Sequence, residues 1–158
     1  MAALYGRGGS AVGSDTSTID TTKQQALGTR AFDVDGNEYI YLQGVSSVAA
    51  GSWVTFDEAF VTTLLAADAI GRVGVAMAAI DATTKYGWFQ IYGKNTIAKS
   101  DTTADDKPLY ADGTAGRVDD AGSAGDFVFG AWSRSADSSN VLTVELNYPF
   151  VANSGYLT

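Results

Sequence analysis

The side chains best able to do chemistry in this chain are carboxylates, because the sequence contains no histidine and no cysteine. Two adjacent pairs stand out, Asp105-Asp106 and Asp119-Asp120, each within a polar stretch. A glycosidase needs two carboxyl groups about 5–10 Å apart across a cleft. Neighbouring aspartates in a loop instead point in different directions and mainly add charge to the surface. Without a histidine, no serine can form a Ser-His-Asp triad, so we expect no enzymatic activity.

One segment has oxygen ligands spaced as in a calcium loop, Asp33-Val-Asp35-Gly36-Asn37-Glu38. An EF-hand loop requires glycine at its sixth position and a bidentate glutamate at its twelfth. Here the glycine is at the fourth position, and the twelfth falls near Gly44. We therefore interpret the segment as a turn between two strands. The glycine-rich stretches match neither the P-loop nor the dinucleotide-binding fingerprint, so the sequence indicates no metal site and no cofactor.

A third group with functional potential is aromatic. Trp53, Tyr86, Trp88 and Tyr92 are candidates for a subunit interface or an aromatic surface. Such side chains usually fill the core or anchor a contact between proteins. On the expected strand, Tyr86, Trp88 and Tyr92 share one face, where they would also suit stacking on sugar rings. We favour a core or interface role and keep a glycan platform as the alternative.

Composition narrows the set of partners. The 158 residues include 18 Asp and Glu against 10 Lys and Arg, a formal net charge of −8. An acidic surface repels phosphate backbones, so we expect no nucleic-acid binding. No stretch approaches the roughly 20 apolar residues that span a bilayer, and the N-terminus lacks a signal-peptide pattern, so we expect no membrane segment.

The elements that position these residues are expected to be β-strands. The clearest pattern is a hairpin in which Thr29–Val34 and Asn37–Leu42 flank Asp35-Gly36, residues typical of a two-residue type I′ turn. Neither face of this hairpin is polar throughout, so we expect both faces to be covered. The register of such a turn pairs Phe32 with Tyr39, Arg30 with Tyr41, and Ala31 with Ile40.

Further short strands follow at regular spacing. A stretch between 57 and 68 is ambiguous, with either a strand near Phe60–Thr63 or a helical turn through Leu64–Ala67. The last strand alternates regularly, which predicts that Leu142, Val144, Leu146 and Tyr148 point inward. The expected strands are Ser52–Phe56, Arg72–Ile80, Tyr86–Tyr92, Asn95–Lys99, Lys107–Ala111, Asp126–Arg134 and Val141–Phe150.

About eight short antiparallel strands without a clear helix predict an all-β domain, either a small β-barrel or β-tulip-like fold or a sandwich. Residues 1–28 are rich in Gly, Ser and Thr and have no strand or helix periodicity. We expect them to form an extended N-terminal arm, either disordered or ordered on a partner. The β-domain then covers residues 29–151, and residues 152–158 form a short C-terminal tail.

The order of these pieces resembles the head decoration, or capsid cement, proteins of tailed bacteriophages. The resemblance covers roughly residues 27–150 and rests on general pattern rather than on a catalytic motif. The segments that carry it are Leu27-Gly-Thr-Arg30, Asp35-Gly-Asn-Glu-Tyr-Ile-Tyr41, Ala50-Gly-Ser-Trp-Val54, Gly71-Arg-Val-Gly-Val-Ala-Met-Ala-Ala-Ile80 and Tyr86-Gly-Trp-Phe-Gln-Ile-Tyr-Gly93.

The resemblance implies a structural protein without enzymatic activity that binds the major capsid protein on the outer surface of the virion. It also implies synthesis in the host cytoplasm and assembly as a homotrimer. In that family an extended terminal arm often lies across the shell, which makes Leu4, Tyr5 and Arg7 the expected capsid contacts. The alternative that the residues leave open is a glycan-binding β-domain displayed on a virion or a cell.

Overall fold

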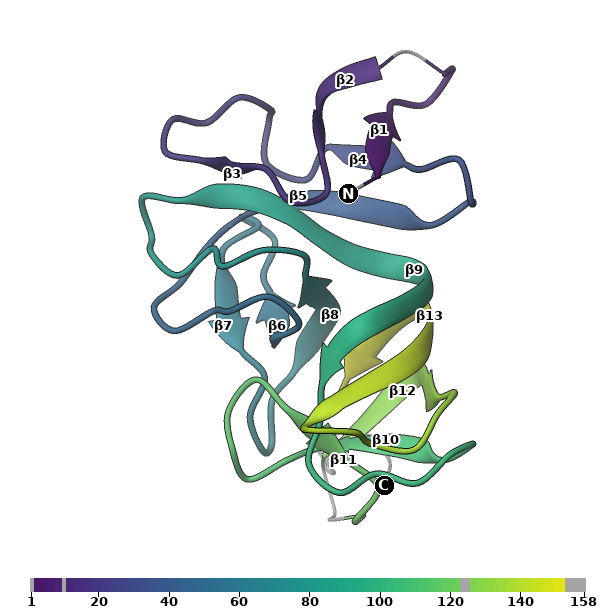
Figure 1. Ribbon diagram of the computed structural model, residues 1–158. Coiled ribbons are helices and arrows are strands. Elements are labelled where there is room, and N and C mark those ends of the chain that lie inside the picture. Colours follow the sequence, from purple (N-terminus) through teal and green to yellow (C-terminus); the bar gives the residue numbers. More distant parts are fainter. Residues whose placement is uncertain (1, 10, 123–125, 153–158) are drawn as a thin grey trace.

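All regular secondary structure is β-strand in the computed structural model, which describes residues 2–9, 11–122 and 126–152 (Figure 1). The strands join in one antiparallel sheet, which confirms the expected all-β fold. None of the described segments forms a helix that could cross a membrane. The strands are β1 (Ala3–Tyr5), β2 (Ala11–Asp15), β3 (Ile19–Asp20), β4 (Arg30–Phe32), β5 (Glu38–Gln43), β6 (Trp53–Phe56), β7 (Thr62–Leu64), β8 (Gly71–Ala76), β9 (Tyr86–Lys99), β10 (Pro108–Ala111), β11 (Val118–Asp119), β12 (Phe127–Ser133) and β13 (Val141–Val151).

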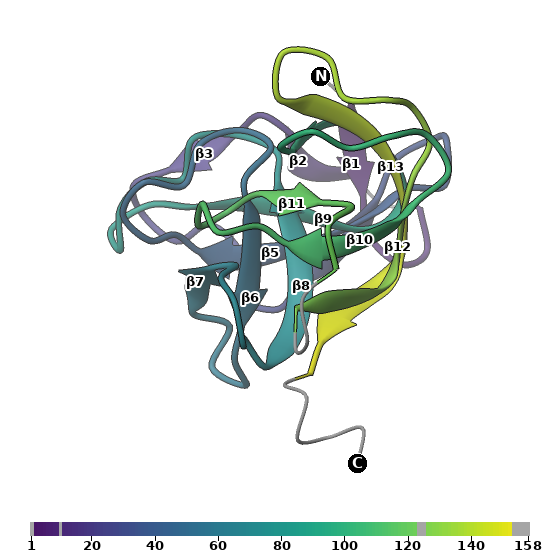
Figure 2. The same cartoon turned by 90° about the horizontal axis from the view of Figure 1, so that it is seen from below.

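The sheet runs in the order β11, β10, β12, β13, β8, β9, β5, β4, β1, β2, and β6 and β7 branch from β8. Across the described ranges it does not close into a barrel, and the arrangement is consistent with a sandwich, one of the expected architectures. Figure 2 shows β6 and β7 on the opposite side of the molecule from β12 and β13. More strands are present than the sequence predicted, because short ones form within residues 1–28 and in the loop before β12.

Strand β9 connects the two ends of the sheet, since it pairs with β3, β5, β8 and β13. The sequence predicted two strands here, separated at Gly93, whereas the structure has one strand that bends at this glycine, where φ is +93°. The bend releases backbone carbonyls from regular pairing. The buried Gln90 side chain donates to the carbonyls of Tyr92 and Lys94, both at 3.0 Å, and accepts from Asn95 at 2.9 Å. These bonds satisfy the polar groups where the strand changes direction.

The turn between β4 and β5 differs from the predicted type I′ turn. Only Gly36 has a positive φ, +83°, so the turn is a type I turn followed by one left-handed glycine. The carboxylate of Asp33 accepts from the backbone N–H of Asp35 and Asn37 at 2.9 and 3.0 Å, which favours this longer turn. The added residue shifts the register by one. The observed pairs are Arg30 with Ile40, Ala31 with Tyr39, and Phe32 with Glu38.

The last strand also departs from its predicted alternation. Leu142, Val144 and Leu146 are buried as expected, but Tyr148 is 47% exposed. Its φ is +48°, and the register with β12 shifts at the same level, which identifies a β-bulge. The extra residue reverses which face the following side chains occupy, so Phe150 also points outward.

Three short strands within residues 2–9 and 11–28 join the sheet, which differs from the expected arm. Strand β1 lies between β2 and β4, and β3 pairs with β9. Leu4 is 1% exposed and packs in one cluster with Tyr41 and Trp88. The hairpin has an apolar face that needs cover, as the sequence indicated, and the N-terminal strands of the same chain supply it. Of the expected C-terminal tail, residues 153–158 lie outside the described residues.

Candidate interaction surface

One face of the sheet carries a row of aromatic side chains on β10, β12 and β13, and the row is followed by Arg72 on β8. Direct cross-strand partners place their side chains on the same face of a sheet. Partners of this kind are Tyr110 and Phe127, Phe129 and Phe150, Phe150 and Arg72, and Arg72 and Phe56. We call the rings of Tyr110, Phe127, Phe129 and Phe150 the aromatic row. Phe56 lies beyond Arg72 but is only 5% exposed and packs in the core.

The rings in the row contact one another in sequence. The centroids of Tyr110 and Phe127 are 5.3 Å apart, and those of Phe127 and Phe129 are 4.6 Å apart, both edge to face. Phe129 and Phe150 are stacked at 4.8 Å with an angle of 7° between their planes. Phe150 is 46% exposed. Tyr110, Phe127 and Phe129 are half-buried. The row is therefore a packed aromatic strip that is partly open to solvent, a feature that suits contact with another macromolecule.

Arg72 lies at the end of the row, between Phe150 and the buried Phe56. Its guanidinium carbon is 4.6 Å from the ring centroid of Phe56 and 5.5 Å from that of Phe60, both cation–π distances. The described residues contain four ion-pair contacts, and none involves Arg72. Its only side-chain hydrogen bond among these residues goes to the carbonyl of Asp57 at 3.5 Å. Within the described ranges, Arg72 therefore presents a positive charge without a carboxylate partner on an aromatic base.

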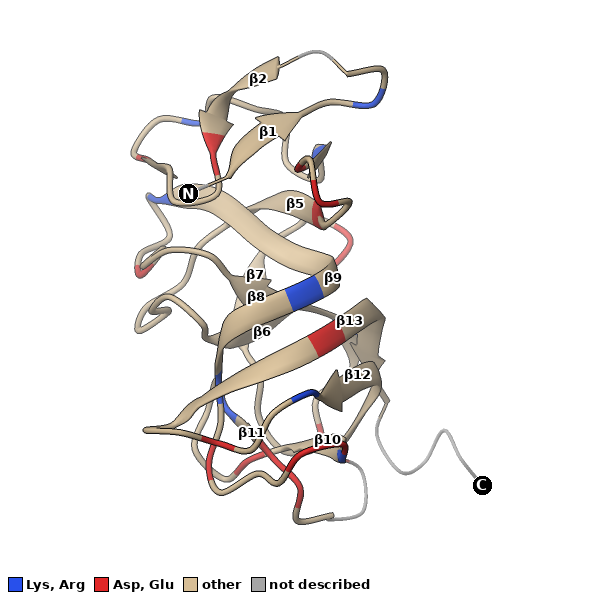
Figure 3. Cartoon of the chain, turned by 45° about the vertical axis from the view of Figure 1, so that its right-hand side comes forward, with Lys and Arg blue, Asp and Glu red and all other residues tan. Residues whose placement is uncertain are grey.

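The opposite end of the row is acidic. Asp119 is the direct partner of Tyr110 on β11, so its carboxylate lies on the same face as the row. Burial raises the pKa of Asp119, and neighbouring carboxylates raise it further. Figure 3 shows Asp and Glu gathered in the loops around β10 and β11. We call the carboxylates of Asp101, Asp112, Asp119 and Asp120 the acid end.

A second aromatic contact lies beside the row. The rings of Tyr92 and Tyr148 are 5.2 Å apart, and both side chains are at least 40% exposed. The hydroxyl of Tyr148 donates to the buried carboxylate of Glu38 at 2.6 Å, a bond that raises the pKa of Tyr148. Arg30 pairs with the same carboxylate at 3.0 Å and lies 5.7 Å from the Tyr148 ring. The hydrogen bond to this ion-paired carboxylate holds the Tyr148 ring in place beside Tyr92.

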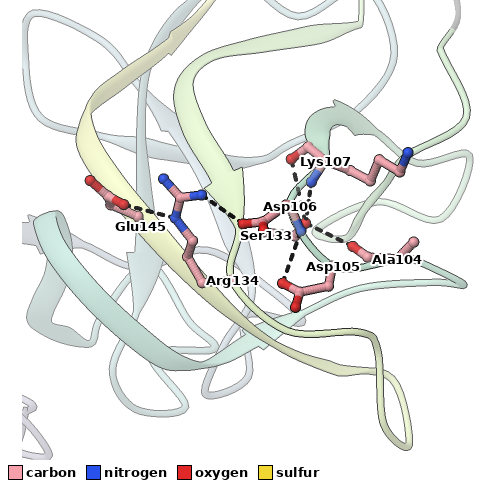
Figure 4. A network of polar contacts seen from close by, with 7 residues as sticks. All are labelled: Ala104, Asp105, Asp106, Lys107, Ser133, Arg134 and Glu145. Carbon is pink, nitrogen blue, oxygen red and sulfur yellow. Dashed lines mark hydrogen bonds and ion pairs between the residues drawn. The ribbon is translucent and has the colours of Figure 1, made fainter.

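The carboxylate pair Asp105-Asp106 has a structural role. Asp106 pairs with Arg134 at 2.8 Å, and Arg134 also pairs with Glu145 on β13 at 2.9 Å (Figure 4). Asp105 accepts from the backbone N–H of Asp106 at 2.9 Å. The hydroxyl of Ser133 joins the same region to β12 through the backbone of Ala104 and Lys107. This network ties the loop before β10 to two strands.

The second carboxylate pair also lacks the features of a catalytic site. Asp120 accepts from the backbone N–H of Ala104 at 2.8 Å, and Asp119 accepts from that of Ala121 at 3.2 Å. Among the described residues, no group of three or more His, Cys, Asp or Glu is placed to hold a metal ion. In the described part of the chain, these two carboxylates therefore add surface charge and accept hydrogen bonds from backbone N–H groups of loops.

The predicted aromatic residues divide between core and surface. Trp53 and Trp88 are both 0% exposed, and their indole N–H groups donate to the carbonyl of Lys99 and the hydroxyl of Ser14 at 3.0 Å. Tyr86 is half-buried, 6.4 Å from Tyr41, and Tyr92 is exposed. Because Trp88 is enclosed, the structure does not assemble the glycan platform considered above.

The three predicted capsid contacts are placed differently from one another. Leu4 points into the core, Tyr5 is half-buried beside Phe32, and Arg7 is exposed in the turn between β1 and β2. Arg7 alone of the three is freely available to a partner in this conformation. The hairpin of β1 and β2, which includes Tyr5 and Arg7, lies at one end of the molecule (Figure 1), whereas the Leu4 side chain is buried.

Sequence reasoning did not identify the aromatic row. Phe127 and Phe129 alternate on their strand, which was a usable signal that they share a face. Their contact with Phe150 depends on the bulge at Tyr148, and the position of Arg72 depends on how distant strands pair. Comparison of the chain with protein-family models, characterised proteins and solved structures finds no match.

Proposed function

We propose that this protein is a structural component of a phage virion that binds the outer surface of the assembled capsid and stabilises it. The observation that carries the proposal is the projecting turn between β1 and β2, which presents Arg7 to solvent. The choice of the capsid as partner comes from the resemblance of residues 27–150 to head decoration proteins. In this proposal the chain is made in the host cytoplasm, binds the major capsid protein, assembles as a homotrimer and catalyses no reaction.

The physical requirement for such a protein is differential binding. A ligand stabilises an assembled state only by binding it more tightly than the alternatives. Many copies on one shell make modest individual affinities effective, because each copy bridges subunits that are already held close together. The net charge of −8 keeps such a crowded outer surface soluble.

The end of the molecule that carries Arg7 is our candidate for the capsid contact. Arg7 is exposed in a turn whose glycines Gly8 and Gly9 have φ of +103° and +83°. No described atom would lie within 4 Å of a Cβ at either glycine, so this turn projects away from the body. A projecting turn with one cation suits a shallow acidic site on a neighbouring protein.

The test is co-sedimentation with assembled, expanded empty capsids. Wild-type protein should pellet with the shells in a saturable manner, and Arg7→Glu should reduce occupancy while leaving the unfolding temperature unchanged. Removing residues 1–28 is unsuitable, because it would also remove Leu4 from the core. Lys23→Glu is the matched control, since it makes the same charge change at another exposed site in the same segment. Failure of the wild-type protein to pellet would contradict the proposal.

A further inference from the structure

We propose that a groove on the outer face of β9 and β13 is a binding site for a neutral oligosaccharide. The inference goes beyond the proposed function, whose candidate capsid contact is the turn between β1 and β2. The groove also differs from the glycan platform considered from the sequence, because Tyr92 is the only residue that the two share.

The groove has the size of a small-molecule site. Its volume is about 580 Å³, and ligand pockets in proteins typically measure about 300–1,000 Å³. The backbone of β9 and β13 forms its floor, and side chains that are exposed or half-buried surround it. These side chains are Tyr92, Lys94, Arg134, Thr143, Glu145 and Asn147.

Two exposed aromatic rings lie on either side of β13. Trp132 on β12 is the direct partner of Glu145, and it is 38% exposed. Tyr92 on β9 is the direct partner of Asn147, and it is 40% exposed. Direct partners share a face of the sheet, so both rings lie on the face that carries the groove. Two strand-to-strand steps separate β12 from β9, which is about 10 Å.

Aromatic rings at this spacing suit a chain of sugar rings. The face of an aromatic ring carries partial negative charge. One side of a pyranose ring consists largely of C–H groups, which carry partial positive charge and are apolar enough to stack on such a face. Trp132 and Tyr92 can therefore each hold one sugar unit, with the units between them lying over β13.

The groove is held in one conformation before a ligand binds. The Tyr92 ring packs against that of Tyr148 at 5.2 Å. Arg134 is fixed by ion pairs with Asp106 at 2.8 Å and with Glu145 at 2.9 Å (Figure 4). Groups that are already ordered lose little conformational entropy on binding, which favours affinity for a small ligand.

Polar atoms along the groove remain free to bind a ligand. Among the described residues, the side chains of Lys94 and Asn147 make no hydrogen bond or ion pair, and Nη2 of Arg134 and Oε1 of Glu145 are also without a partner. The set thus contains both donors and acceptors. A sugar hydroxyl donates and accepts at once, so neighbouring hydroxyls can bind such a mixed set.

The balance of charge selects a neutral ligand. Lys94 and Arg134 are positive, and each positive charge has a negative counterpart nearby. Glu145 is the direct partner of Lys94 across the two strands, and Asp106 pairs with Arg134. An anionic ligand would be repelled by Glu145, and a cationic ligand by Lys94 and Arg134. A neutral molecule with many hydroxyls meets neither penalty.

The test is acrylamide quenching of tryptophan fluorescence in the full-length protein. Trp132 is the one exposed tryptophan of the three, because Trp53 and Trp88 are both 0% exposed. Quenching therefore reports on the side of the groove. The probes are neutral oligosaccharides of glucose, galactose, mannose or N-acetylglucosamine, with sialylated oligosaccharides as acidic comparisons. At least one neutral probe should protect Trp132 saturably, and sialylated probes should bind at least about tenfold more weakly.

Variants then locate the site by calorimetric titration with the neutral probe that protects best. Tyr92→Ala and Trp132→Ala should each raise Kd at least about tenfold, as expected for aromatic residues that dominate a contact. Phe150→Ala is the matched control, since it removes an exposed ring outside the groove and should leave Kd unchanged. Glu145→Gln keeps the shape of the side chain, gives the groove a net positive charge and should shift preference toward sialylated probes. Thermal unfolding checks that each variant is folded.

Three results would overturn the inference. They are the absence of saturable protection by any neutral probe at millimolar concentrations, an unchanged Kd in both aromatic variants, and a preference of the wild-type protein for sialylated probes. None of them bears on capsid binding, which co-sedimentation measures separately. A protein that binds sugars and ignores capsids would retain this inference and contradict the proposed function.

Discussion

Leu4→Ala tests whether the N-terminal strands belong to the body of the protein. Leu4 is 1% exposed and packs with Ala31, Tyr41 and Trp88. Replacing a buried leucine by alanine costs about 2–5 kcal/mol through lost burial and the cavity left behind. Strand β1 is short and lies near the end of the chain, where the structure can relax, so we expect the lower part of that range, about 2–3 kcal/mol.

The assay is urea unfolding followed by tryptophan fluorescence, with thermal unfolding as a second measurement. For a domain of this size, each kcal/mol lowers Tm by about 2–4 °C, so the expected fall is about 5–10 °C. Trp88 lies in the same cluster as Leu4, whereas Trp53 lies in another cluster. Fluorescence therefore reports on the affected region as well as on the whole domain.

The matched control is Val34→Ala, which shortens an apolar side chain that is 82% exposed. It should change the free energy of unfolding by less than about 0.5 kcal/mol. If Leu4→Ala behaves like Val34→Ala, residues 2–9 do not pack on the hairpin. The segment would then be a free arm, and the placement of β1 described above would be refuted.

Three further predictions concern charge and backbone geometry. Asp119 has a raised pKa in the folded state, so its protonated form stabilises the fold at low pH, and this stabilisation is lost as pH rises through that pKa. Asp119→Asn should therefore raise the urea midpoint at pH 7 and leave it unchanged near pH 3. Burial opposes ionisation of Asp33, but hydrogen bonds from Asn37, Tyr39 and backbone N–H groups outweigh it and lower the pKa. The Asp33 carboxylate thus stabilises the fold above its ordinary pKa, and this contribution is lost as pH falls. Asp33→Asn should lower the free energy of unfolding at pH 7 and lower it progressively less toward pH 3. An equal effect at both pH values would contradict the role given to the Asp33 carboxylate. Gly93→Ala should lower Tm, because φ is +93° and an added Cβ would overlap the side chain of Asn37; an unchanged Tm would show that the bend of β9 does not require glycine.

Much of the fold follows from local sequence pattern, and each departure from that pattern has an identifiable physical cause. Alternation located most of the strands, and Asp-Gly correctly placed a turn at residue 36. The turn type was wrong because the carboxylate of Asp33 binds two backbone N–H groups, which favours a longer turn and a shifted register. Composition alone does not reveal that competition, since Asp suits several turn types.

Less of the candidate surface than of the fold could be predicted from the sequence. The prediction that Tyr148 points inward assumed an uninterrupted strand, and the bulge reversed the alternation beyond Leu146. Periodicity does not show that Trp88 is buried, because it packs with Leu4, which is far away in the sequence. A row built from separate segments depends on long-range pairing, which periodicity within each segment does not specify.

The thermal stability of assembled shells, with and without this protein, tests the central claim most directly. Expanded empty capsids would be heated alone and with saturating protein, and the temperature at which the shells lose integrity would be recorded. A protein that binds the assembled lattice in preference to its free subunits should raise that temperature. A shell that fails at the same temperature in the presence of the protein would contradict the account.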